Sequence, residues 1–145
     1  PSVEVIDCAE SAQPRPQTRL GIVCQSTTSP GQAAQIVDAV RTANPHADIA
    51  YADTICQPTR DRQSAVRRLA AQVDAVVVVG GKNSNNTREL AALCRASGKP
   101  AYHVQSASDL DREWFAACRV VGLTAGTSTL DETIEEVRQA LASME

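Results

Sequence analysis

The residues Ala75–Val79 form an uninterrupted apolar run of strand length. Such a run, rich in valine, predicts a strand that is buried on both faces, as in the centre of a parallel sheet. Other short apolar runs, which predict strands over 20–24, 49–52, 101–104 and 120–123, alternate with stretches of helical period. We therefore predict an α/β fold: a three-layer α/β/α domain with a mostly parallel sheet of four to five strands.

The helical stretches have recognisable ends. Ser29 is suited to cap a helix that begins with Pro30 and ends near Asn44. Further helices are expected over 61–72, from Asn86 or Thr87 to Gly98, over 110–117 and from 130 onward. Residues 1–18 stand apart: 3–6 could form a strand, and Pro14 and Pro16 indicate a linker or the remnant of a preceding domain. The expected α/β domain spans 19–145, and we expect the chain to be cut from something longer or to dock onto another domain.

Composition excludes several classes of protein. Hydrophobic residues make up 43% and charged residues 21% of the chain, which is typical of a globular domain. A formal net charge of -3 and only 3% aromatic residues argue against a nucleic-acid partner. The longest apolar run is too short to span a membrane, and no secretory signal opens the chain, so we expect a cytoplasmic protein. Five cysteines without a C-x-x-C pair indicate reduced thiols.

Four polar loops follow the expected strands, and each leads into a helix. The carboxyl ends of parallel strands meet at one edge of a sheet, where helix N-termini favour anions. The loops contain hydroxyls and amides and almost no carboxylates, and they lie at 25–29, 54–59, 80–87 and 124–129. Ser, Thr and Asn also cap helices in most proteins, so a single loop of this kind would mean little. Together the loops favour a phosphate pocket, although the glycine spacing matches neither a dinucleotide fingerprint nor a P-loop.

Cys56 lies in one of these loops, outside any apolar periodicity. Near helix N-termini a thiolate is favoured, and a thiolate attacks electrophiles or binds soft metals and iron–sulfur clusters. A nucleophilic role would need a base, but His46 is expected at the opposite edge and His103 inside a strand. We therefore favour a cluster ligand with partners from elsewhere over an incidental loop thiol.

The same loops resemble the 4-hydroxy-3-methylbut-2-enyl diphosphate reductase family. The resemblance runs from about Leu20 to the C-terminus, with the motifs in the family's order. They read VCQSTTS at 23–29, TICQPTRDRQ at 54–63, VGGKNSNNTR at 79–88 and GLTAGTS at 122–128. The resemblance implies an iron–sulfur enzyme of the non-mevalonate isoprenoid route, built from three similar α/β domains. It would perform a reductive dehydroxylation that yields isopentenyl and dimethylallyl diphosphate.

The resemblance also assigns roles to individual residues. Cys56 corresponds to the third cysteine of a [4Fe-4S] cluster, and Thr59 to an active-site threonine that orients substrate or a bound water. Substrate-binding positions, mostly for the diphosphate, are Ser26, Thr27, Ser84, Asn85, Asn86 and Ser128. Asn85 stands where the family commonly has a serine, and Ser26-Thr27 replaces a threonine pair. Arg62 and Gln63 match the family pattern, although an arginine early in a helix could equally support the loop.

The family's other two cluster cysteines, its catalytic glutamate and its substrate-facing histidines belong to segments N-terminal to these residues. Cys8, in the linker, Cys24, in a strand, and Cys94 and Cys118, on apolar helix faces, do not replace them. The hypothesis is a C-terminal domain that is inactive alone and without its own cluster, working with the enzyme's N-terminal domains and an electron donor such as ferredoxin or flavodoxin. The alternatives are a stand-alone module that binds a phosphorylated metabolite and, less favoured, a thiol enzyme acting through Cys56.

Overall fold

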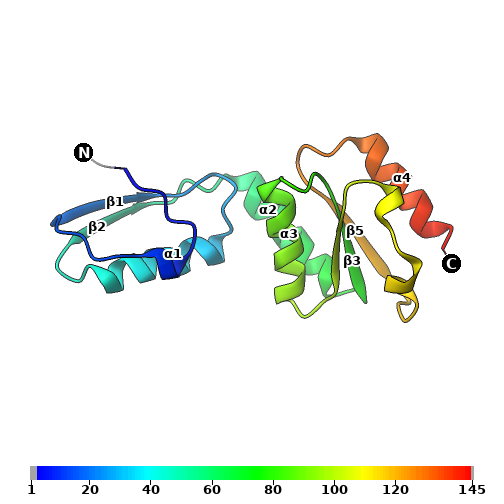
Figure 1. The fold of residues 1–145 in the computed structure, drawn as a ribbon, viewed down its shortest axis with the longest axis horizontal. Coiled ribbons are helices and arrows are strands. Elements are labelled where there is room, and N and C mark those ends of the chain that lie inside the picture. Colours follow the sequence, from blue (N-terminus) through cyan, green and yellow to red (C-terminus); the bar gives the residue numbers. More distant parts are fainter. Residues whose placement is uncertain (1–2, 145) are drawn as a thin grey trace. The chain divides into compact units, whose positions relative to one another are not determined.

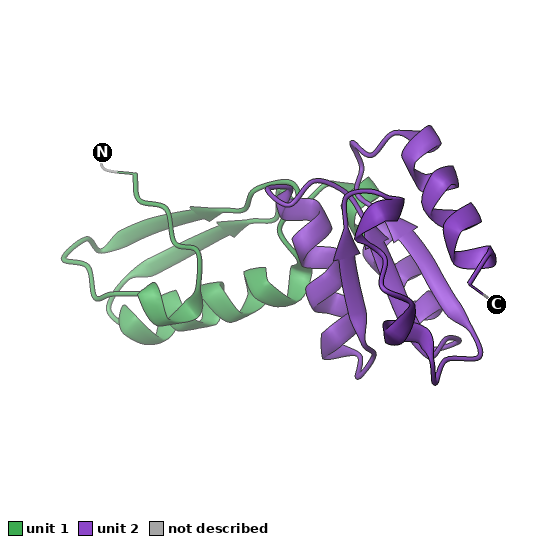
Figure 2. Cartoon of the chain, turned by 45° about the vertical axis from the view of Figure 1, so that its right-hand side comes forward, with its two compact units in different colours: residues 1–60 green, residues 61–145 purple. Residues whose placement is uncertain are grey.

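The computed structural model describes residues 3–144 and divides the chain into two compact units, residues 1–60 and 61–145 (Figure 2). Five strands, four α-helices and three short 3-10 segments alternate along the described residues. Within that range no helix exceeds 14 residues, and none combines the length and hydrophobicity of a transmembrane span.

Unit 1 contains a small parallel sheet of two strands, β1 (Arg19–Val23) and β2 (Asp48–Ala52). The helix α1 (Pro30–Ala43) connects them and lies along one face of the sheet (Figure 1). The Ser29 hydroxyl accepts a hydrogen bond from the Gln32 N–H at 3.2 Å, so the predicted cap is confirmed. Residues 3–7 do not form the strand considered from the sequence; a single 3-10 turn, η1 (Ala9–Ser11), follows them.

Unit 2 contains a parallel sheet with the strand order β4-β3-β5. Its strands are β3 (Ala75–Val79), β4 (Ala101–Val104) and β5 (Val121–Ala125). All five residues of the central strand β3 are buried, as their uninterrupted apolar pattern predicts.

Helices cover both faces of this second sheet, which gives unit 2 three layers (Figure 1). The helices α2 (Gln57–Ala70) and α3 (Asn85–Ala96) pack on one face, where Val66 and Leu90 contact the side of β3 that carries Val76 and Val78. The helix α4 (Asp131–Ala142) covers the other face, where Val137 packs with Val77 and Val79. The α/β class and the three-layer arrangement are confirmed.

Two expectations about the architecture are wrong. The five strands do not share one sheet, because β1 pairs only with β2 and the other three strands pair among themselves. The expected helix over 110–117 is replaced by two 3-10 segments, η2 (Ala107–Asp109) and η3 (Arg112–Phe115). Here Ser106 and Asp109 form a capping box and Asp111 caps η3, so side chains hold short turns in place of a continuous helix.

Candidate functional site

The loops after β1 and β2 meet in unit 1. The Cys56 N–H donates to the Ser26 carbonyl oxygen at 3.1 Å, and the Cys24 N–H donates to Thr54 Oγ1 at 2.9 Å. The Thr54 hydroxyl in turn donates to the Cys24 carbonyl. Because the two strands are parallel, both loops leave the same edge of the sheet, as predicted for this pair.

Cys56 immediately precedes α2, and its half-buried thiol lies beside Thr59. The distance from Cys56 Sγ to Thr59 Oγ1 is 3.1 Å. The hydrogen bond from the Thr59 hydroxyl, followed by that from the Thr59 N–H, holds the pKa of the Cys56 thiol below its ordinary value of 9.0, and the Arg60 charge adds to the effect. A thiol with this environment favours its thiolate form, which is the form that binds soft metals and iron–sulfur clusters.

An ion pair between Asp53 and Arg60 closes the loop that carries Cys56. The same aspartate accepts a hydrogen bond from the Ile55 N–H at 3.1 Å through its second oxygen. Sequence reasoning missed this pair, since an Asp and an Arg seven residues apart, on either side of the loop between β2 and α2, carry no recognisable spacing signal. Its effect is to fix the path of the chain on both sides of Cys56.

The loops after β3 and β5 meet in unit 2. The Ser84 hydroxyl caps α3 by accepting the Thr87 N–H at 3.3 Å, which leaves its own O–H available to donate. The Asn86 side chain donates to Thr127 Oγ1 at 3.1 Å, and Ser128 follows as an exposed residue. Asn85 pairs instead with Arg88 of its own helix. Ser84 and Asn86 therefore lie at the N-terminal turn of α3, where unpaired N–H groups favour an anion, and Ser128 is next in sequence to Thr127, which contacts Asn86.

Arg62, near the start of α2, contacts the end of β5. Its Nη1 donates to the carbonyl oxygen of Ala125, the last residue of that strand, at 3.1 Å. Gln63, beside it, is buried, and its Oε1 has no hydrogen-bond partner within residues 3–144. The placement of Cys56, Thr59, Ser26 and Thr27 at one edge with Ser84, Asn86 and Ser128 stays a prediction.

The other cysteines occupy different environments. Cys94 is fully buried in the core against β3, and burial raises the pKa of its thiol. Cys24 lies just after β1, not within it, with its Sγ 3.5 Å from the Tyr51 hydroxyl. Cys118 is half-buried after η3, so its expected place on a helix face is wrong. Among residues 3–144, no three His, Cys, Asp or Glu side chains gather as a metal site.

The two histidines lie where the sequence predicts. His46 lies in the turn before β2, where its Nε2 is 2.8 Å from the Arg15 carbonyl oxygen. His103 lies within β4, and its Nε2 is 2.9 Å from the Gly80 carbonyl oxygen. Both rings thus contact backbone carbonyls, which is a structural use of histidine.

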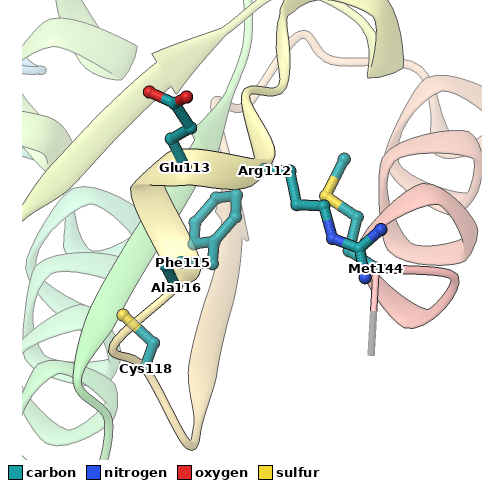
Figure 3. A pocket seen from close by; sticks show the side chains of 6 residues that line it. All are labelled: Arg112, Glu113, Phe115, Ala116, Cys118 and Met144. Carbon is teal, nitrogen blue, oxygen red and sulfur yellow. The ribbon is translucent and has the colours of Figure 1, made fainter.

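A pocket of about 490 Å³ lies between η3 and the end of α4 (Figure 3). Its lining residues are Arg112, Glu113, Phe115, Ala116, Cys118 and Met144. None of them belongs to the polar loops that follow the strands, and no pattern in the sequence indicated a pocket here.

Comparison with known proteins identifies relatives along nearly the whole chain. The family model described as LytB protein matches residues 1–142. A protein of Anaeromyxobacter sp. (strain K), named 4-hydroxy-3-methylbut-2-enyl diphosphate reductase, is 42% identical over 126 residues, which cover 87% of this chain and 45% of the relative. The chain thus spans less than half the length of the curated relatives it matches.

Two solved structures are also similar. One, described as (E)-4-hydroxy-3-methyl-but-2-enyl diphosphate reductase, the terminal enzyme of the non-mevalonate pathway, is 35% identical with a TM-score of 0.59; the match covers 88% of this chain and 44% of that one. The other, the E-1-hydroxy-2-methyl-but-2-enyl-4-diphosphate reductase of Plasmodium falciparum, has a TM-score of 0.82 over 96% of this chain and 45% of that one. At 23% identity, this second likeness supports the fold alone.

Proposed function

The chain belongs to the LytB protein family, and on that premise we propose that it is part of a 4-hydroxy-3-methylbut-2-enyl diphosphate reductase. The reaction is a reductive dehydroxylation: a carbon–oxygen bond breaks, a carbon–hydrogen bond forms, and two electrons and two protons are consumed as water leaves. The products are isopentenyl and dimethylallyl diphosphate. The observation that carries the proposal is the position of the Cys56 thiol directly before α2, with its Sγ 3.1 Å from Thr59 Oγ1, in the loop whose motif resembles that family.

Cys56 fits the role of one cluster ligand. Its thiol is half-buried at the start of α2, and the Thr59 hydroxyl favours the thiolate, which is the ligand form. A [4Fe-4S] cluster bound there would supply the electrons and an iron to which the substrate hydroxyl can bind. Such clusters are held by several cysteines, so the remaining ligands would come from the other domains of the enzyme. Electrons would come from a donor such as ferredoxin or flavodoxin, in the reducing cytoplasm where free thiols persist.

The polar loops would bind the diphosphate of the substrate. Ser84 lies just before the first turn of α3 and Asn86 lies in it, where helix N–H groups and the helix dipole attract phosphate oxygens. Ser128 follows Thr127, which is tied to Asn86, and Asn85 has an amide that can also donate. Ser26 and Thr27 would add hydroxyls from the loop after β1, and Thr59 would orient the substrate or a bound water beside Cys56.

A chimera tests this function. The matching segment of the Anaeromyxobacter reductase is replaced by this chain, and the protein is purified without oxygen. We expect about four iron atoms per chain and reduction of the hydroxylated diphosphate by a reduced dye. The C56S variant of the chimera should lose both iron and activity, whereas C118S, the matched control in unit 2, should keep both.

Two outcomes would contradict the proposal: a C56S chimera that keeps its full iron content, or a stable cluster reconstituted on the 145-residue chain alone. A stand-alone module for phosphorylated metabolites remains the rival function, because the loops around α3 lie wholly within unit 2 and do not include the thiol. That rival predicts that the chain binds inorganic pyrophosphate while the chimera contains neither iron nor activity.

A further inference from the structure

Thr87, in the first turn of α3, has an unusual environment. The residue is only 1% exposed, and its Oγ1 has no hydrogen-bond partner within residues 3–144. A buried hydroxyl without a partner costs free energy, because it has given up its hydrogen bonds to water. A compensating reason for this side chain must therefore lie in what it packs against.

Two glycines pack against the Thr87 side chain. A Cβ added to Gly80 would lie 2.4 Å from Thr87 Oγ1, and a Cβ added to Gly126 would lie 2.3 Å from the same atom. Real Cβ atoms essentially never come so close, so only glycine fits at either position beside a threonine. Gly80 follows β3 and Gly126 follows β5, so Thr87 holds apart the backbones of two neighbouring loops.

The same three segments are joined by hydrogen bonds. The Gly126 N–H and the Thr129 hydroxyl both donate to the Val79 carbonyl oxygen, at 2.8 and 3.0 Å. Asn86, next to Thr87, donates to Thr127 at 3.1 Å. The first turn of α3 and the loop after β5 are therefore fixed against the end of β3, with the Thr87 side chain in the centre of the junction.

We propose that Thr87 is a positioning residue for diphosphate binding: its side chain, wedged between Gly80 and Gly126, sets the spacing between Asn86 on α3 and Ser128 on the loop after β5. The inference rests on the proposed function, since it takes these loops to bind the diphosphate. Thr87 itself does not contact the ligand. Its contribution is to hold two groups of hydrogen-bond donors at the separation that a diphosphate needs.

A size swap tests the wedge. T87A removes the hydroxyl and the methyl of the Thr87 side chain. G126A adds a methyl 2.3 Å from the Thr87 hydroxyl, so the two groups must move apart. Each single variant should weaken pyrophosphate binding about tenfold, which is within the usual range of coupling between residues in contact. In the double variant the new methyl refills the vacated space, with Thr129 Oγ1 at 3.4 Å and the remaining Thr87 Cβ at 3.5 Å, and affinity should return. T87S keeps the hydroxyl and should bind like the wild type. G31A, in α1 of unit 1, is the matched control, since a Cβ there meets nothing within 4 Å.

The measurement is a titration of the full 145-residue chain with inorganic pyrophosphate, followed through backbone amide shifts and the Asn86 side-chain amide, with urea unfolding recorded for each variant. If the wild type does not bind pyrophosphate, the loops' proposed function and the role of Thr87 are both overturned. If the wild type binds, and T87A binds equally well or the double variant does not recover, the positioning role alone is overturned. Should G126A fail to fold, the comparison of T87A with T87S decides.

Discussion

The Cys56 thiol depends on one neighbour more than on any other. Thr59 lies three residues further on, at the start of α2, and residues with this spacing lie on the same side of a helix. Its hydroxyl is the largest cause of the lowered pKa of Cys56, ahead of its N–H and of the Arg60 charge. Thr59 therefore favours the thiolate form of Cys56. The sequence alone does not reveal this effect, because a threonine near the start of a helix is equally typical of a cap.

Replacing Thr59 with valine should raise the pKa of Cys56 toward the ordinary thiol value of 9.0. The thiolate is the reactive form, so alkylation of Cys56 by iodoacetamide should slow near neutral pH in T59V and match the wild type at pH values above the ordinary pKa. Mass spectrometry of the Cys56 peptide across this pH range gives the two profiles. T42V, at an exposed threonine of α1, is the control and should leave the profile unchanged. Superimposable profiles for T59V and wild type would remove Thr59 from this role.

At the scale of elements, β3 is the centre of the unit 2 core, because helices pack on both of its faces. Leu90, Ala91 and Cys94 of α3 pack on one face together with α2, and Val137 of α4 packs on the other. The loops that follow β3 and β5 start from this packed core. Their geometry therefore depends on the packing of α3 as well as on their own hydrogen bonds.

Leu90, at 1% exposure, should be among the residues on which this packing depends most. L90A should lower the free energy of unfolding of unit 2 by about 2–5 kcal/mol, the usual cost of removing a buried leucine side chain. L130A makes the same chemical change at a side chain that is 68% exposed, and its effect should stay within about 0.5 kcal/mol. Urea unfolding followed by Trp114 fluorescence and circular dichroism measures both. Equal effects of the two variants would contradict the assignment of α3 to the core.

At the scale of the whole chain, the two units differ in how much core each holds. Every residue of β3 is buried, whereas β1 and β2 alternate between half-buried and exposed residues. Two-stranded sheets are only marginally stable by themselves. We therefore expect the β1–β2 sheet to be less stable than the sheet around β3.

Amide hydrogen exchange on the full chain should show this difference. We expect the amides of Val76–Val79 to exchange at least about tenfold more slowly than those in the ladder between β1 and β2, because exposed two-stranded pairing opens locally at low cost. Exchange followed by NMR at neutral pH gives residue-level rates. Equal protection in both sheets would show that unit 1 is as stable as unit 2.

Features set by neighbouring residues could be predicted from the sequence, whereas contacts between distant segments could not. Local patterns predicted the buried strand β3, the Ser29 cap and the loops that follow the strands, because side-chain period and capping depend on neighbours within a few residues. They also identified Cys56 as an unusual cysteine, since it lies outside every apolar pattern. The Asp53–Arg60 pair and the contacts of Thr87 carried no such signal.

By itself, the sequence determined most of the strands and helices, because these follow from local periodicity, while the binding role of the polar loops stays a prediction. Only the tertiary structure decided that the strands form two sheets, since pairing joins segments far apart in the chain. It also decided that Gly80 and Gly126 face one threonine side chain, because three separate segments must pack together before that contact exists.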